Sequence, residues 1–227
     1  MTLDTALRAT EILLALAFLQ QSFEHLLHPR GERLLFGVRA VLALFLLWGV
    51  APLPVLLALS LHSIWMLHRF AGPYNGGSDR MGLLILYCLT LAHALPPGLA
   101  REAAFGYLAL QVVLSYFISG QVKLVNPDWR RGVALRDVFA FSAYPVSEGL
   151  RGYARRPRLM LAMSWAVILF ELAFPASLLH PDLLIAALVA ALAFHLANAC
   201  LFGLNRFVWA WLAAYPSLIW LQDRVLA

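Results

Sequence analysis

Residues 183–202 have the sequence LLIAALVAALAFHLANACLF, and this stretch decides the class of fold. It contains no Asp, Glu, Lys or Arg, and it is as long as the roughly 20 apolar residues that an α-helix needs to cross a membrane. Seven more apolar segments lie at about residues 10–27, 34–51, 53–68, 81–95, 104–121, 159–178 and 207–221. The pattern predicts an all-α, polytopic integral membrane bundle with about eight hydrophobic segments.

The composition of the whole chain agrees with a membrane protein. Of its 227 residues, 62% are hydrophobic and 13% are charged, against about 25% charged residues in ordinary soluble domains. The segments leave no room for a sizeable water-soluble domain, so we expect one transmembrane domain over residues 1–227. The net charge of +5 does not indicate nucleic acid, because Lys and Arg are also enriched in the cytoplasmic loops of membrane proteins.

Proline-containing breaks predict where the chain turns. Pro52-Leu53-Pro54, Pro96-Pro97-Gly98 and His180-Pro181-Asp182 each interrupt the apolar pattern. Proline removes a backbone donor and clashes with the preceding helical turn, so a continuous helix through these positions is not expected. The sequence therefore predicts tight turns on one side of the membrane at all three.

The basic residues predict how the chain is oriented. With eight crossings, every Lys and Arg except Arg8, Arg101 and Arg224 falls on one face, which the positive-inside rule makes cytoplasmic. Residues 121–158 form the longest basic loop on that face. Within the loop, residues 134–141 have apolar side chains at helical spacing, which is typical of a short helix at the membrane interface.

Four of the Asp, Glu, Lys and Arg residues fall inside the expected spans: Glu11, Glu24, Arg39 and Glu171. Charges at membrane depth are costly and usually face the protein interior, so these positions are the first places to look for chemistry. Glu171 lies four residues before Pro175, deep in its segment. Two interpretations stay open for it, a hydrogen bond between helices and a group that handles a proton.

Histidines raise two further hypotheses. Glu24, His25 and His28 could begin a metal site, but the chain has no second group of matching ligands, so we favour a hydrogen-bonded cluster and assign no metal. Four histidines in or beside separate segments could ligate a haem if two of them faced each other at one depth. They are His62, His68, His93 and His195.

Two passages carry a resemblance to a known family. They are residues 116–132, YFISGQVKLVNPDWRRG, and residues 194–207, FHLANACLFGLNRF. Together they resemble the transmembrane domain of vitamin K-dependent gamma-carboxylases and their bacterial relatives, called the horizontally transferred transmembrane (HTTM) domain. The first is similar to the family pattern Tyr-Phe-x-(small)-Gly-x-x-Lys-Leu-x-x-x-Trp-x-x-Gly, with one extra residue before the tryptophan. The second is similar to Phe-His-x-x-Asn-x-x-Leu-Phe-x-x-x-x-Phe.

Six residues are candidates for the site, and the resemblance implies the role of Lys123 among them. Lys123 is the counterpart of the carboxylase lysine that acts as a base on reduced vitamin K, and Asp128 and Glu171 would tune it. The substrate-binding residues would be His195, Asn198 and Trp129. A lysine with little water around it can serve as a base. Without the family, a lysine that extends to the membrane interface is the simpler interpretation of Lys123.

This chain departs from the carboxylases in two ways. They carry a long soluble portion after the membrane domain, whereas we expect none after the last segment here. Their additional histidine has no convincing counterpart, because the corresponding stretch, residues 74–80, is YNGGSDR. The glycines of this stretch could let the backbone approach a ligand closely.

Two functions from different classes follow. We favour a non-catalytic or accessory subunit of a larger membrane complex that binds partner helices, lipid or pigment. The alternative is a membrane enzyme that acts on a quinone-like, lipid-soluble substrate with Lys123 as base. No cofactor is assigned, and a vitamin K-like quinone or a lipid is the candidate bound molecule. The expected partners are the bilayer and other membrane subunits, and the expected location is a bacterial inner membrane.

Overall fold

The computed structural model describes residues 1–28, 32–69, 76–141 and 148–226, and all regular secondary structure in these ranges is helical. Arg30 of the predicted basic face lies outside the described residues, as do Tyr74 and Asn75 of the glycine-containing stretch. The chain divides into two compact units. The first contains Met1–Leu110 and Arg206–Ala227, and the second contains Gln111–Asn205.

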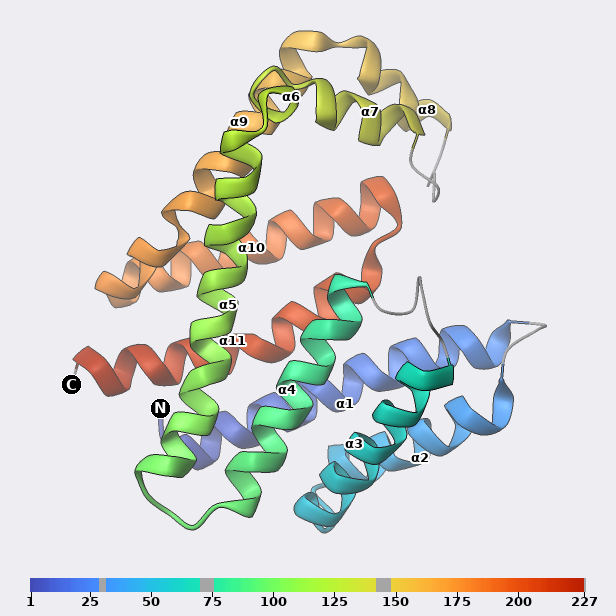
Figure 1. The fold of residues 1–227 in the computed structure, drawn as a ribbon, viewed down its shortest axis with the longest axis vertical. Helices are drawn as coiled ribbons and strands as arrows, with labels where there is room; N and C mark the ends of the chain where they lie inside the picture. The colour runs from blue at the N-terminus through green and yellow to red at the C-terminus, as the bar shows by residue number, and fades with distance from the viewer. Residues whose placement is uncertain (29–31, 70–75, 142–147, 227) are drawn as a thin grey trace. The chain divides into compact units, whose positions relative to one another are not determined.

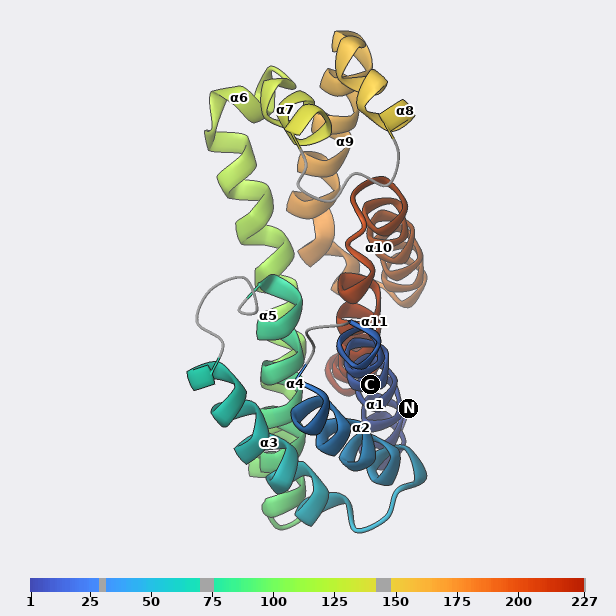
Figure 2. The same cartoon turned by 90° about the vertical axis from the view of Figure 1, so that its right-hand side faces the viewer.

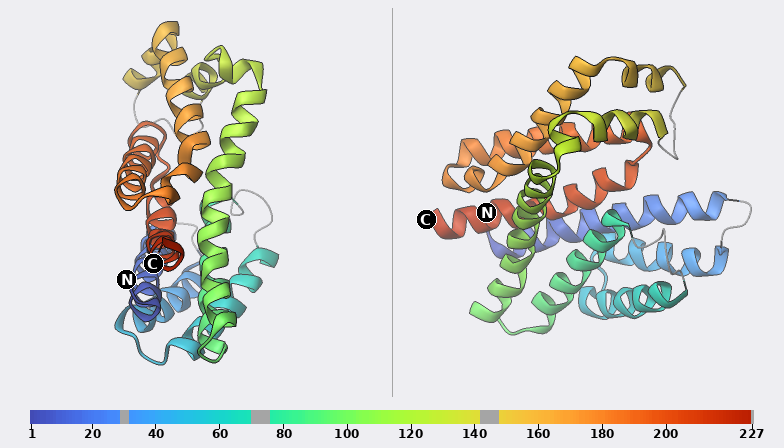
Figure 3. Two further views of the ribbon diagram at one scale, coloured as in Figure 1. Left: turned by 90° about the vertical axis from the view of Figure 1, so that its left-hand side faces the viewer. Right: turned by 45° about the horizontal axis from the view of Figure 1, so that its top comes forward.

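Four helices that pack in a closed cycle form most of the first unit. Its elements are α1 (Leu3–Leu27), α2 (Arg33–Trp48), α3 (Pro52–Arg69), α4 (Gly77–Ala94), the beginning of α5 (Leu99–Val125) and α11 (Asn205–Leu226). Helix α1 packs against α2 and α4, and α3 packs against the same two helices. Figures 1 and 3 show α1 and α2 side by side. Phe36, Leu56 and Ile85 are fully buried in this unit, so apolar packing holds the four helices together.

The turn between α2 and α3 confirms the first predicted break. Helix α2 ends at Gly49, whose positive φ of 73° is a left-handed conformation that glycine adopts without strain. Pro52 is the first residue of α3, where a missing backbone N–H leaves no hydrogen bond unmade. The prolines therefore begin a helix rather than interrupt one. The break at residues 96–98 is confirmed in the same way, since it separates α4 from α5.

The second unit contains the rest of α5 and the elements that follow it. They are α6 (Pro127–Arg130), α7 (Val133–Phe141), α8 (Glu148–Arg151), η2 (Gly152–Arg155), α9 (Pro157–Ala173), η3 (Phe174–Leu179) and α10 (Pro181–Phe202). Figure 2 shows α7 beside α9, and the two helices pack together. Leu135 and Phe139 of α7 are buried with Met160 and Phe202 in one cluster. The helix predicted at residues 134–141 is thus confirmed, and its apolar side chains pack within the unit.

Two prolines determine where helices end and begin between α9 and α10. Pro175 lacks the N–H that would bond the carbonyl of Glu171, and α9 ends at Ala173, where the tighter 3₁₀ helix η3 begins. The third predicted break is confirmed at His180, whose imidazole Nδ1 accepts a hydrogen bond from the Asp182 N–H at 3.2 Å and so caps α10. Pro181 is then the first residue of α10.

The structure corrects the expected number of crossings. Every apolar segment lies in a helix, but only three helices in the described part of the chain are long and apolar enough to cross a membrane: Leu99–Val125, Pro157–Leu179 and Pro181–Phe202. Helix α2 has 16 residues and falls short of the roughly 20 needed. Helix α1 is long enough, but it carries Asp4, Arg8, Glu11 and Glu24. About eight spans are therefore not supported.

The cluster around Phe139 provides a test of the second unit. Phe139 is 4% exposed and lies edge to face against Phe202, with ring centroids 4.8 Å apart. Phe139→Ala should destabilise the protein by about 3–5 kcal/mol, because it leaves a cavity in this cluster. Phe141→Ala is the matched control, since Phe141 lies on the same helix and is 79% exposed. Thermal unfolding in detergent measures both, and equal melting temperatures would contradict the packing described.

Candidate functional site

Three residues of the first specific passage lie on one face of α5. Tyr116, Gly120 and Lys123 are spaced four and three residues apart, which places them in a row along a helix. All three contact residues that follow them in the second unit. The candidate site is built along this row.

Gly120 lets α5 and α9 approach closely. A Cβ atom on Gly120 would lie 2.9 Å from the backbone nitrogen of Leu172 and 3.0 Å from the Cβ of Glu171. No larger residue fits against backbone at such a distance, so the glycine sets how near α9 lies to α5. The side chain of Glu171 is thereby within reach of the residue one turn further along α5.

Lys123 is that residue, and its ammonium group forms an ion pair with Glu171. The Nζ atom donates to Oε1 at 2.8 Å and to Oε2 at 2.7 Å, so both carboxylate oxygens are used. The side chain of Glu171 is 4% exposed and that of Lys123 is 17% exposed. Trp129 adds a cation–π contact, with its ring centroid 5.3 Å from Nζ. Three of the six predicted site residues therefore lie together.

Asp128 does not take part in this pair. It lies in α6, whose start is capped by Asn126: the side-chain Oδ1 of Asn126 accepts a hydrogen bond from the Asp128 N–H at 2.8 Å. The Asp128 carboxylate is exposed and forms an ion pair with Arg131 at 2.6 Å. After α6 the chain passes Gly132, which has φ 72° and would clash with the backbone of Leu161 if it had a Cβ. The passage around α6 thus orients Trp129 toward Lys123 and Asp128 toward its own helix.

A second polar pair lies two helical turns before Lys123. The His195 imidazole, which is 3% exposed, is 2.8 Å through Nε2 from the hydroxyl oxygen of Tyr116. Tyr116 stacks on Phe174 with ring centroids 4.1 Å apart and meets Phe170 edge to face. The pair is therefore enclosed by aromatic rings. Tyr116 is the first residue of the motif at residues 116–132, and its hydrogen bond to His195 is not predictable from the sequence.

Asn198 is one turn beyond His195 on α10 and is half-buried. Its backbone carbonyl accepts a hydrogen bond from the Leu204 N–H at 3.3 Å, next to Gly203, which ends the helix in a left-handed conformation. The structure thus places Asn198 at a helix end. It brings His195 to Tyr116, and Lys123 to Glu171 and Trp129.

The other ionisable residues of the apolar segments have partners in the first unit. Glu11 accepts a hydrogen bond from Arg8 and pairs with His93. Glu24 forms an ion pair with Arg206 at 2.8 Å. Arg206 also lies 3.1 Å from the Nε2 of His25, as expected of a hydrogen-bonded cluster.

Histidines considered as haem ligands have other contacts as well. His62 Nε2 is 3.0 Å from the backbone oxygen of Leu35, and His195 is bonded to Tyr116. Within the described ranges, no group of three His, Cys, Asp or Glu side chains is arranged to hold a metal ion.

Comparison with known proteins agrees with the two specific passages. A family model described as the HTTM domain matches residues 103–222, which is more than half of the chain. No curated protein and no solved structure matches the chain.

Gly120→Ala tests the close approach of α5 and α9. The added methyl group would press against the Leu172 backbone, which cannot move as a side chain can, so we expect a loss of about 1–3 kcal/mol in stability. Gly106→Ala on the same helix is the control, because its Cβ would meet the Trp220 ring at an ordinary 3.6 Å. Alanine also favours a helix over glycine by roughly 0.5–1 kcal/mol. Melting temperatures should fall for Gly120→Ala alone.

Proposed function

The chain belongs to the HTTM domain family, and we propose that it acts as a non-catalytic, accessory subunit of a larger membrane complex. In this role its apolar helices bind partner helices, lipid or a pigment. The observation that carries the proposal is the use of both Glu171 oxygens by the Lys123 ammonium.

An ion pair of this geometry favours a structural role for Lys123. A base needs a free lone pair on nitrogen, whereas the Lys123 ammonium donates to both carboxylate oxygens of Glu171. The ring of Trp129 adds a cation–π contact to the same group. Lys123 then joins α5 to α9, and the lysine of the family pattern serves packing in this chain.

The surface of α10 supports the binding of lipid or partner helices. Leu183, Ile185, Val189 and Leu196 are exposed, although they belong to the most apolar helix of the chain. Contact of large apolar side chains with acyl chains or with another helix is favourable, whereas their exposure to water is not. An accessory subunit would use this face.

The bacterial inner membrane is the proposed location, with the basic loops on the cytoplasmic side. Arg155, Arg156 and Arg158 support this orientation, because they are exposed and lie at the start of the apolar helix α9. Arginines next to a membrane-spanning helix are enriched on the cytoplasmic side and interact with anionic headgroups.

A second candidate function, catalysis on a quinone-like lipid-soluble substrate, rests on the burial of Lys123 and Glu171 and not on the charge of the pair. Transfer of a proton from Lys123 to Glu171 would convert the pair into a neutral amine and a carboxylic acid, and burial reduces the cost of that change. The amine could then act as the base, as the likeness to the carboxylases implies. Tyr116 and His195 would provide polar groups on the same side of α5.

Paired substitutions separate the two functions. Lys123→Met or Glu171→Leu alone leaves one buried charge without its partner and should cost up to about 3–5 kcal/mol, measured as a lower melting temperature. Replacing both removes the two charges together and should restore most of the stability. An accessory subunit with both substitutions should still assemble with its partners. A double variant that is stable but has lost a measurable turnover would establish the catalytic alternative instead.

Assembly itself can be measured on the natural complex. The protein, purified from its native membrane in mild detergent, should elute with other membrane subunits in a constant ratio, and the double variant should do the same. Elution as a single species with turnover on a reduced quinone would contradict the accessory role.

A further inference from the structure

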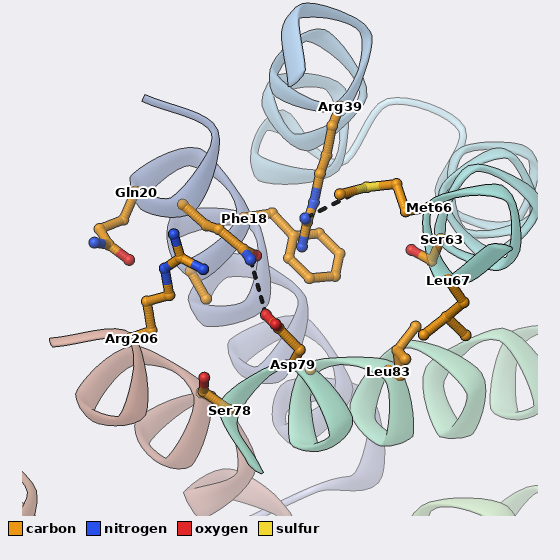
Figure 4. Close-up of a pocket in the computed structure, with 14 residues that line it drawn as sticks. Phe18, Gln20, Arg39, Ser63, Met66, Leu67, Ser78, Asp79, Leu83 and Arg206 are labelled. Carbon is orange, nitrogen blue, oxygen red and sulfur yellow. Dashed lines mark hydrogen bonds between the residues drawn. The ribbon is translucent and has the colours of Figure 1, made fainter. Parts of the chain in front are cut away.

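A pocket of about 50 Å³ lies among helices of the first unit. Its walls come from α1, α2, α3, α4 and the start of α11, and Figure 4 shows the side chains that line it. The polar ones include Gln21, Arg39, Asp79 and Arg206, and the apolar ones include Phe18 and Leu67. The volume is enough for about four water molecules, or for one small polar group such as a carboxylate or a phosphate.

Arg39 is the unusual member of this set. It is 6% exposed, and its guanidinium lies over the ring of Phe18, 4.0 Å from the centroid. Its Nη1 donates to the thioether sulfur of Met66 at 3.7 Å, which is a weak acceptor, and its Nε has no hydrogen-bond partner. Among the described residues, no oxygen accepts a hydrogen bond from this group. A buried guanidinium without an oxygen acceptor costs free energy, so an oxygen atom bound in the pocket would supply the acceptor that Arg39 lacks.

The neighbouring charges do not supply that acceptor. The Glu24 carboxylate already accepts a hydrogen bond from Arg206, with which it forms an ion pair at 2.8 Å. Asp79 accepts a hydrogen bond from Gln21 at 2.8 Å and forms no ion pair with Arg39. Burial raises the pKa of the Asp79 carboxyl, although the hydrogen bond from Gln21 and the charges of Arg206 and Arg39 oppose this rise.

The start of α4 adds to the positive character. Helix α4 begins at Gly77, and Gly76 before it provides no side-chain cap. Ser78 and Asp79, in the first turn, line the pocket. The first N–H groups of a helix lack partners within the helix and attract anions.

One side of the pocket is apolar and reaches the surface. Leu67 lines the pocket and is 37% exposed, and Ile64 lies one turn earlier on α3 and is 43% exposed. An apolar chain attached to a group in the pocket could leave along these side chains.

We propose that this pocket binds the oxyanion of an amphiphilic molecule, a carboxylate or phosphate attached to an apolar chain, with Arg39 as its principal ligand. Two N–H groups of a guanidinium match two oxygens of such an anion. A membrane lipid headgroup and a free amphiphilic acid share this chemistry. The proposal does not depend on the accessory role, because the pocket shares no residue with the Lys123–Glu171 pair.

Phosphate probes test the site on full-length protein that has been stripped of lipid in an uncharged detergent. Inorganic phosphate and hexyl phosphate are titrated at constant ionic strength, and binding is measured by calorimetry and by the shift in melting temperature. We expect hexyl phosphate to bind more tightly than inorganic phosphate. Arg39→Met should weaken its binding at least about tenfold, as expected for the loss of charged hydrogen bonds. Arg33→Gln, an exposed position on the same helix, should bind like the wild type.

The source of the anion is decided in nanodiscs. Phosphatidylcholine discs with and without phosphatidic acid are compared by native mass spectrometry. Retention of phosphatidic acid by the wild type but not by Arg39→Met indicates a lipid headgroup. Binding of hexyl phosphate without retention of phosphatidic acid indicates a free amphiphile.

The stability of Arg39→Met without ligand and the affinity of Arg39→Lys are the two controls. Without ligand, Arg39→Met should melt at the wild-type temperature or higher, because no hydrogen bond to oxygen is lost. Arg39→Lys, which keeps the charge but loses the planar fork, should fold and bind hexyl phosphate about tenfold more weakly. Equal affinity of the wild type and both variants would overturn the proposal, as would the absence of any phosphate binding to the wild type.

Discussion

A charge inside an apolar helix needs a partner, and the pairing of Lys123 with Glu171 satisfies this need between α5 and α9. The pair forms because Gly120 brings the backbone of α9 close to α5. The aromatic rings around Tyr116 and His195 then fill the adjoining space. Close packing, the buried pair and the second polar pair thus depend on one another along a single face of α5.

Local features of the sequence predicted much of the helix arrangement. Apolar runs mark every long helix, and the prolines at residues 52, 96, 175 and 181 lie at helix boundaries because their missing N–H groups allow few other positions. The number of crossings was not predictable from apolar character alone. Helix length and charge decided it: α2 ends at Gly49 after 16 residues, too few to cross a membrane, and α1 is long enough but carries four charged residues.

The residues of the candidate site were predictable from the sequence, but which of them interact with each other was not. The family pattern and the cost of a buried charge single out Lys123 and Glu171 separately, yet the two residues are 48 positions apart and nothing local links them. Asp128 shows that closeness in sequence is also misleading. It lies five positions after Lys123, yet its carboxylate forms an ion pair with Arg131. The role of Tyr116 was not predictable, because an aromatic residue in an apolar segment is normally read as a packing residue. Only the structure shows that its hydroxyl group is hydrogen-bonded to His195.

The same rule explains why Arg39 stands apart. Of the four acidic or basic residues other than histidine in the expected spans, Glu11, Glu24 and Glu171 each contact a cation, and Arg39 contacts a sulfur atom and an aromatic face. Because the three acids all have cationic partners, the absence of an anionic partner for Arg39 points to a ligand that would supply one.

Pro175 has a consequence for the thickness of bilayer that the protein can match. The 3₁₀ turns of η3 rise about 2.0 Å per residue, whereas an α-helix rises about 1.5 Å. The six residues of η3 therefore extend the Pro157–Leu179 segment by roughly 3 Å beyond an uninterrupted α-helix. A difference of a few ångströms is comparable to that between membranes of different lipid composition, so this proline adjusts the hydrophobic length of the helix without adding a residue.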